Sequence, residues 1–194
     1  YMSTNSADTT YHWFAGHAFF WHGNSASDDN DWNTAGNWSR SETNATPALV
    51  VSPRKDDETA IITICEGSAS SDDKVLILSD NVGVKSFTVK EKTRVNLKGK
   101  NVTADLIVNK GIIAVDGTNA SPIIATPGGT ITHDENSTIE FTGWTSGNAI
   151  STTYAGLGLV GSKYNYLKIS GSGDFTFADS NLFVEKDTSL ECTK

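Results

Sequence analysis

Positive charge is scarce in this sequence. Its 194 residues include 15 Lys and Arg against 23 Asp and Glu, which gives a formal net charge of −8. Nucleic-acid phosphates require clustered Lys and Arg, so the composition argues against a nucleic-acid partner. The acidity argues equally against anionic membranes. We interpret the negative charge as a feature that maintains solubility.

Long hydrophobic runs are also missing. No segment reaches the roughly 18 apolar residues of a membrane span, so we expect no membrane insertion by this chain. The first ten residues, YMSTNSADTT, contain neither the basic region nor the apolar run of a secretion signal. We expect the chain to be a piece of a longer protein with neighbouring domains.

Cysteine and the long helix-forming residues are few. The chain has one Met, three Arg and two Cys, at Cys65 and Cys192. A disulfide between the two would add on the order of 4–5 kcal/mol through chain entropy, and two separate free thiols are the alternative. Sequence alone leaves this pairing open. The remaining composition, rich in Thr, Ser, Asn, Gly and Asp, is typical of a turn-rich β protein.

Short apolar pairs, separated by polar turns, recur through the chain. The pairs are Phe87/Val89, Val95/Leu97, Leu106/Val108, Ile113/Val115, Ile139/Phe141, Leu167/Ile169, Phe175/Phe177, Leu182/Val184 and Leu190/Cys192. The two-residue period within each pair is that of a strand. Three successive steps span about 20 to 25 residues, the size of one turn of a parallel β-helix. A β-sandwich is the alternative, although Asn-Gly hairpin turns are nearly absent.

Tryptophans concentrate in residues 20–39, where Trp21, Trp32 and Trp38 lie among acids, Asn and Gly. A stack of strands exposes backbone edges and apolar core at each end. We therefore expect an aromatic-rich N-terminal capping segment over residues 11–47, with all three tryptophans buried. Residues 1–10 are expected to be a disordered tail, and residues 48–194 to form β-helix rungs, starting with a short strand at 48–51.

Two stretches carry a resemblance to a known family. Residues 21–23 (WHG) followed by 31–39 (DWNTAGNWS) are similar to a W-x-G…W-x-x-x-x-N-W segment, and residues 164–173 (YNYLKISGSG) to an F-Y-N-L-x-I-x-G-x-G run. The chain thereby resembles the repeat domains of bacterial surface and secreted proteins, both autotransporter-like and filamentous-adhesin-like. The resemblance implies a right-handed parallel β-helix of the pectin-lyase type in an extracellular or cell-surface protein, and implies no catalytic residues.

A calcium site is one hypothesis for the acidic loop. Asp28, Asp29, Asp31 and Asn33 offer the oxygen ligands that Ca²⁺ takes. An EF-hand is excluded, because Thr34 stands where that loop requires Gly. A solvated acidic loop is the alternative, and no other cofactor is expected.

Longer loops are predicted at residues 118–130 and 143–166, and loops on a rigid scaffold commonly carry recognition. Trp144, Tyr154, Tyr164 and Tyr166 lie in or beside the second loop. Their flat rings could stack on sugars and form a glycan-binding groove. The alternative is that Trp144 and Tyr166 cover the edge of the stack.

Catalysis is not expected. Polysaccharide lyases and hydrolases of this fold need acids, with a base or a second carboxylate, on one face. The rung strands offer few acids, Asp105 and Glu140 and little else, and Arg94 is the only arginine expected among them. We predict a non-catalytic module that presents a binding surface to a protein or glycan of a host or matrix. A carbohydrate-active enzyme of the same fold and a passive spacer repeat are the alternatives.

Overall fold

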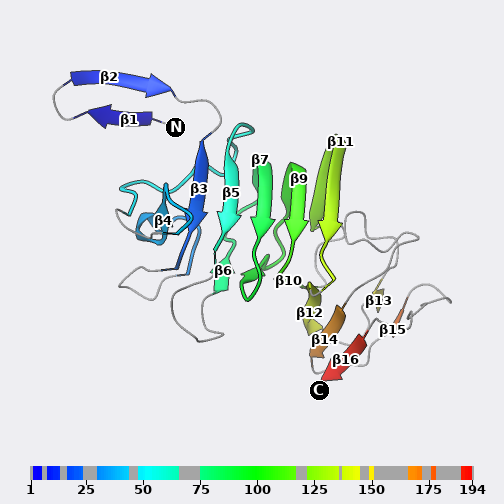
Figure 1. Cartoon of the computed structure of the whole chain (residues 1–194). Coiled ribbons are helices and arrows are strands. Elements are labelled where there is room, and N and C mark those ends of the chain that lie inside the picture. The colour runs from blue at the N-terminus through cyan, green and yellow to red at the C-terminus, as the bar shows by residue number, and fades with distance from the viewer. Residues whose placement is uncertain are drawn as a thin grey trace.

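The computed structural model consists of strands and the loops that join them (Figure 1). It describes residues 2–5, 8–13, 17–23, 30–43, 48–65, 75–116, 122–135, 137–144, 149–150, 166–171, 176–177 and 189–193. Within these ranges the only helical element is η1 (Ala35–Asn37), a single 3-10 turn. None of the described residues forms a helix long and apolar enough to cross a membrane.

Most strands belong to two six-stranded sheets. The first has the order β11-β9-β7-β5-β3-β4 and the second the order β16-β14-β12-β10-β8-β6. The first comprises β3 (Ala18–Trp21), β4 (Trp38–Ser39), β5 (Ile61–Ile64), β7 (Val82–Val89), β9 (Val102–Asn109) and β11 (Ile123–His133). The second comprises β6 (Val75–Ile77), β8 (Arg94–Asn96), β10 (Ile112–Asp116), β12 (Thr138–Trp144), β14 (Tyr166–Gly171) and β16 (Ser189–Thr193).

Every neighbouring pair in both sheets is parallel except β3 with β4. From β5 to β12 consecutive strands alternate between the two sheets, so each strand pairs with the strand two later in the chain. Figure 1 shows β3, β5, β7, β9 and β11 side by side in this order. The prediction of an all-β fold is confirmed for the described residues, and their strands are largely parallel.

Parallel pairing aligns apolar side chains in rows across the strands. In the first sheet Phe19, Ile62, Phe87, Ile107 and Ile131 lie in register. A row of the second sheet consists of Leu76, Val95, Ile113 and Ile139, and the backbone positions of Leu167 and Leu190 continue the same register. The row members numbered 19 to 139 belong to one hydrophobic core. All of them are buried except Ile131, which is partly buried. Burial of Phe87/Val89, Val95/Leu97, Ile113/Val115 and Ile139/Phe141 was predicted and is confirmed.

The predicted pair Leu106/Val108 is wrong. Leu106 is 40% exposed, and the buried side chains of β9 are those of Val102, Ala104, Ile107 and Asn109. The alternation shifts by one residue in β9, because the successive residues Asp105 and Leu106 both face outward. Strand β7 has the same shift between Val84 and Phe87. A strict two-residue period fails at such a shift.

Further loop and tail expectations differ from the structure. Met2–Asn5 (β1) and Asp8–Trp13 (β2) pair as antiparallel strands where a disordered tail was expected. Residues 48–51 form no strand, and Val50 is 90% exposed. Strand β11 runs through much of the loop predicted at 118–130, and residues 126–129 are an insertion opposite Asp105.

The loop predicted at 143–166 is described only in part. Its first two residues belong to β12, its last residue to β14, and Ala149–Ile150 forms β13. Strand β13 pairs in parallel with β15 (Thr176–Phe177). Phe175, Leu182 and Val184 of the predicted pairs lie outside the described residues.

Cys65 and Cys192 lie too far apart for a disulfide. Cys65 directly follows β5 and is a buried free thiol, and burial raises its pKa to about 11. Cys192 lies on β16, at one edge of the second sheet. The strand that follows Cys65 is β6, at the opposite edge, five strand positions away. Five spacings of 4.8 Å amount to about 24 Å, whereas a disulfide needs Cα atoms within about 7 Å. The question that the sequence left open is thereby answered.

Candidate functional site

The three tryptophans of residues 20–39 are buried, as predicted. Trp21, Trp32 and Trp38 have no exposed surface. The rings of Trp32 and Trp38 meet edge to face, with centroids 4.7 Å apart. The indole of Trp38 donates to the Trp32 carbonyl at 2.8 Å, and that of Trp32 donates to the Pro53 carbonyl at 2.8 Å. This geometry fixes the tryptophans as packing residues, because no ring faces an open groove.

The same segment extends both sheets at their N-terminal ends. Strand β4 pairs with the outer edge of β3. At the edge of the second sheet Asp31 forms a parallel bridge with Ile77, the Ile77 amide donates to Asn30, and the Trp32 amide donates to Ile77. Residues 30–39 therefore satisfy edge groups that would otherwise face solvent.

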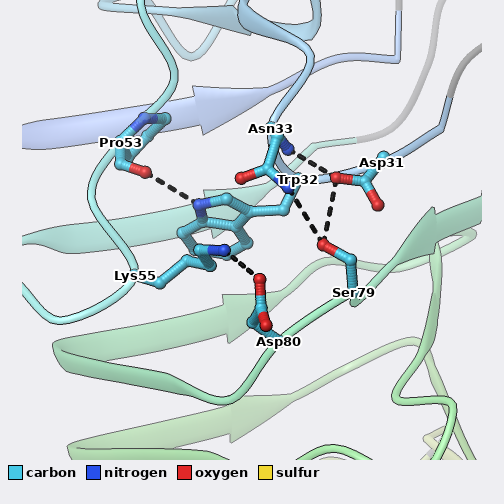
Figure 2. Close-up of polar contacts among 7 residues, drawn as sticks. All are labelled: Asp31, Trp32, Asn33, Pro53, Lys55, Ser79 and Asp80. Carbon is cyan, nitrogen blue, oxygen red and sulfur yellow. Dashed lines mark hydrogen bonds and ion pairs between the residues drawn. The ribbon is translucent and has the colours of Figure 1, made fainter.

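A polar cluster lies on the outside of this end of the molecule (Figure 2). One carboxylate oxygen of Asp31 accepts hydrogen bonds from the Asn33 backbone amide at 2.8 Å and the Ser79 hydroxyl at 3.2 Å. The Asn33 side chain donates to the same hydroxyl at 3.0 Å. An ion pair between Lys55 and Asp80 lies beside them. These contacts tie the tryptophan segment to the turn that follows β6.

The calcium hypothesis rests on two residues in this cluster and two outside the described part. Asp31 and Asn33 lie together, whereas Asp28 and Asp29 are not described. No group of three or more His, Cys, Asp or Glu side chains that could hold a metal occurs among the described residues. Ca²⁺ takes six to eight oxygen ligands, and here one Asp31 oxygen already accepts two hydrogen bonds. The calcium site stays a prediction.

Arg94 and Glu140, the two strand charges named in the sequence analysis, form an ion pair. Arg94 lies on β8, in register with Ile112 of the intervening strand β10, and Glu140 lies on β12, in register with Ala114 of β10. The Glu140 side chain is 8% exposed and that of Arg94 is 26% exposed. Asp105 lies on β9 in the other sheet and accepts a hydrogen bond from Thr126. The described strands therefore do not place Asp105 and Glu140 as a catalytic carboxylate pair.

The aromatic residues predicted to bind glycans are dispersed where the structure describes them. Trp144 ends β12 opposite Gly171, and Tyr166 begins β14 opposite Thr138. The two therefore occupy opposite ends of neighbouring strands, separated by about 17 Å along the strand direction. Tyr154 and Tyr164 lie outside the described residues. The four-residue glycan groove stays a prediction.

The outer face of the first sheet, the side turned away from the core, carries two neighbouring rows of uncharged side chains. One row consists of Ile61, Ser86, Leu106 and Thr130, and the next of Thr63, Thr88, Val108 and Thr132. All eight side chains are exposed or half-buried. Hydroxyl and aliphatic groups alternate in the first row, and three threonines flank one valine in the second, at a strand spacing of about 4.8 Å. Such a face can contact a partner through both hydrogen bonds and apolar surface.

Charged residues border this face at one side and are paired with each other. Lys90 pairs with Glu42, and Lys110 pairs with Asp134 at 3.5 Å. A depression of about 310 Å³ lies between the two lysines, with Thr88 and Glu91 in its lining. Because each lysine has an acidic partner and Glu91 is close, the depression carries no net positive charge and does not favour an anion.

Sequence reasoning missed a second depression, which we name the polar hollow. It measures about 300 Å³ and is lined by Lys55, Asp56, Glu58, Asn81, Val82, Gly83, Asn101 and Thr103. Its signal in the sequence is Gly83 between two valines, since a glycine inside a strand pattern marks a bulge or a close approach. Comparison with known proteins gives no match: no family model, no curated protein and no solved structure.

Proposed function

We propose that this chain is a rigid, non-catalytic binding module built on a right-handed parallel β-helix. The alternation of strands between two parallel sheets supports a coil in which one strand of each sheet belongs to each turn. Aligned rows of apolar side chains support it further. A β-sandwich is disfavoured because its sheets are antiparallel. Residues 30–39 act as the cap at the N-terminal end of the coil.

The two uncharged rows on the outer face of the first sheet are the observation that carries the binding role. Ile61 and Leu106 are 37% and 40% exposed there, with Ser and Thr hydroxyls in the same rows. A face of this composition on a rigid scaffold suits a protein or glycan of a host or matrix surface. The resemblance to bacterial adhesin-like repeats favours the same role, in an extracellular or cell-surface protein.

Binding without turnover is favoured over catalysis on the same fold. The Arg94–Glu140 ion pair engages the two groups that could otherwise act as base and acid on the outer side of the rungs. Breaking such a pair to do chemistry would leave a poorly solvated charge. The rival functions remain a carbohydrate-active enzyme and a spacer.

The test combines binding and turnover on one preparation of the chain. Immobilised glycans and extracellular-matrix proteins are screened for binding, and acidic polysaccharides are assayed for release of unsaturated or reducing ends. We expect binding without release. Release would establish the enzyme, and absence of both would favour the spacer.

A matched pair of variants assigns the binding to the outer face. Leu106→Glu places a charge on the face, and Val50→Glu places one on an exposed loop residue of similar type. We expect Leu106→Glu to weaken binding at least tenfold and Val50→Glu to leave it unchanged. Equal effects of the two variants would show that the partner binds elsewhere.

A further inference from the structure

Gly83 has no local structural requirement for glycine. A Cβ atom built there meets no atom within 4 Å, and Gly83 is not among the described residues with positive φ. Gly111 and Gly129 differ, because a Cβ would lie 2.3 Å from the Lys90 carbonyl oxygen and 2.6 Å from that of Asp105. Glycine in a strand interior costs roughly 0.5–1 kcal/mol relative to alanine. A strand glycine without a packing reason marks a place where a ligand can approach the backbone.

The polar hollow lies directly over Gly83. Gly83 and Thr103 are register partners on β7 and β9 and form its floor. One wall comes from the loop at Lys55, whose carbonyl accepts from the Gly83 amide at 2.6 Å. Asn81 and Asn101 close one end, and Asn101 donates its backbone amide to the Asn81 side-chain oxygen at 3.1 Å. Three separate segments thus converge on one depression.

The cap holds the wall of the hollow in place. The Trp32 indole donates to the Pro53 carbonyl, and the Lys55 ammonium group pairs with Asp80 (Figure 2). The first contact fixes the start of the loop, and the second fixes its position against the turn after β6. The wall is therefore organised before any ligand arrives, which lowers the entropic cost of binding.

Hydrogen-bonding groups in the hollow match a hydroxyl-rich ligand. The Asn101 side-chain amide and the Thr103 hydroxyl make no hydrogen bond to another described residue. Amides and hydroxyls both donate and accept, as sugar hydroxyls do. Among the lining side chains Asp56 and Glu58 outnumber Lys55, so an anionic ligand is disfavoured.

We propose that the polar hollow binds one neutral sugar residue of a glycan chain. This inference rests on the proposed function and specifies one partner class for it. The sugar lies over Gly83, with its hydroxyls bonded to Asn101, Thr103 and the Glu58 carboxylate. A hollow of about 300 Å³ is at the small end of ligand sites, so the affinity per sugar is expected to be weak.

Glycan arrays with neutral and acidic oligosaccharides test the class of ligand. The best neutral oligosaccharide is then titrated into the chain while backbone amide resonances are followed by NMR. We expect the largest shifts at Gly83, Asn101 and Thr103. Binding of acidic oligosaccharides alone, or shifts confined to other residues, would overturn the inference.

Variants separate this site from the module as a whole. Gly83→Val fills the hollow with a residue that strands accommodate well, and Thr103→Val removes one hydroxyl at constant shape. We expect at least tenfold weaker binding for Gly83→Val and severalfold weaker binding for Thr103→Val. Thr142→Val, on the outer side of β12, is the control and should change binding less than twofold.

The outcomes distinguish the two proposals. Glycan binding that survives Gly83→Val in a folded variant overturns the sugar site and leaves the binding module intact. Binding of a matrix protein without any neutral glycan has the same consequence. If neither glycans nor proteins bind, both proposals fail together.

Discussion

Arg94 and Glu140 are 46 residues apart in the chain, yet they form an ion pair across the intervening strand β10. Parallel pairing of β8, β10 and β12 brings them to the same outer surface. Arg94 is in register with Ile112 of β10 and Glu140 with Ala114, so the ion pair runs diagonally across β10. The contact therefore depends on the register of three consecutive strands of one sheet.

Glu140→Gln is expected to lower the free energy of unfolding by about 2 kcal/mol. The change removes the negative charge and leaves the partly buried Arg94 without its ionic partner, a loss reduced by the exposure of Arg94. Glu135→Gln, at an exposed turn residue, is the control and should stay within about 0.5 kcal/mol. Urea denaturation measures both; equal values for the two variants would contradict a stabilising pair.

Trp32→Ala is expected to destabilise the chain by about 3–5 kcal/mol. It removes a fully buried side chain, its edge-to-face contact with Trp38 and its hydrogen bond to Pro53. Trp32→Phe retains most of the volume and should cost less. A loss under 1 kcal/mol for the alanine variant would mean that residues 30–39 do not stabilise the N-terminal end of the two sheets.

Two glycines are expected to respond in opposite ways to alanine. Gly111→Ala forces a Cβ to within 2.3 Å of the Lys90 carbonyl oxygen, so the backbone of adjacent turns must move. Gly83→Ala meets no atom and should be neutral or stabilising by up to about 1 kcal/mol. Thermal unfolding of the two variants compares them directly. Destabilisation of similar size at both positions would contradict the open space above Gly83 in the polar hollow.

The Asp57 carboxyl makes the folding stability depend on pH, and the direction of its pKa shift sets the sign of that dependence. Desolvation raises its pKa, but hydrogen bonds from the Thr59 hydroxyl and amide, at 2.7 and 3.0 Å, outweigh this and leave the pKa below its ordinary value of 3.8. A carboxyl with a lowered folded-state pKa stabilises the protein fully above the unfolded pKa and loses this as pH falls through the folded pKa.

The stability difference between the native chain and Asp57→Asn should therefore be constant from pH 7 to about pH 5. It should shrink as pH falls below about 4, where the unfolded carboxyl becomes protonated first. Urea denaturation at pH 7, 5 and 3 measures the difference. A difference that grows toward pH 3 would contradict the lowered pKa.

Period-two patterning was sufficient to predict which residues of simple strands are buried, such as Ile113 and Ile139. It failed at Leu106, because two successive residues of β9 face outward there and the alternation shifts by one residue. Burial of Trp32 followed from its size and from the exposed ends that any strand stack has. These features are local or generic, so sequence carries them.

The candidate sites depend on contacts that sequence spacing does not encode. Arg94 meets Glu140 only because of the register of parallel strands, and the polar hollow needs Lys55, Gly83 and Asn101 to converge from three segments. Gly83 alone left a readable signal, as a glycine between valines in a strand pattern. Only the structure shows that no atom packs above Gly83.

Inter-strand nuclear Overhauser effects around Ile113 show whether parallel strands stack turn upon turn, as the proposed scaffold of a binding module requires. Ile113 lies between Val95 and Ile139 in the second sheet. We predict contacts from Ile113 to both neighbours, in the staggered amide-to-Hα pattern of parallel strands. Close Hα-to-Hα contacts between sequence-adjacent strands, the mark of antiparallel hairpins, would contradict the account.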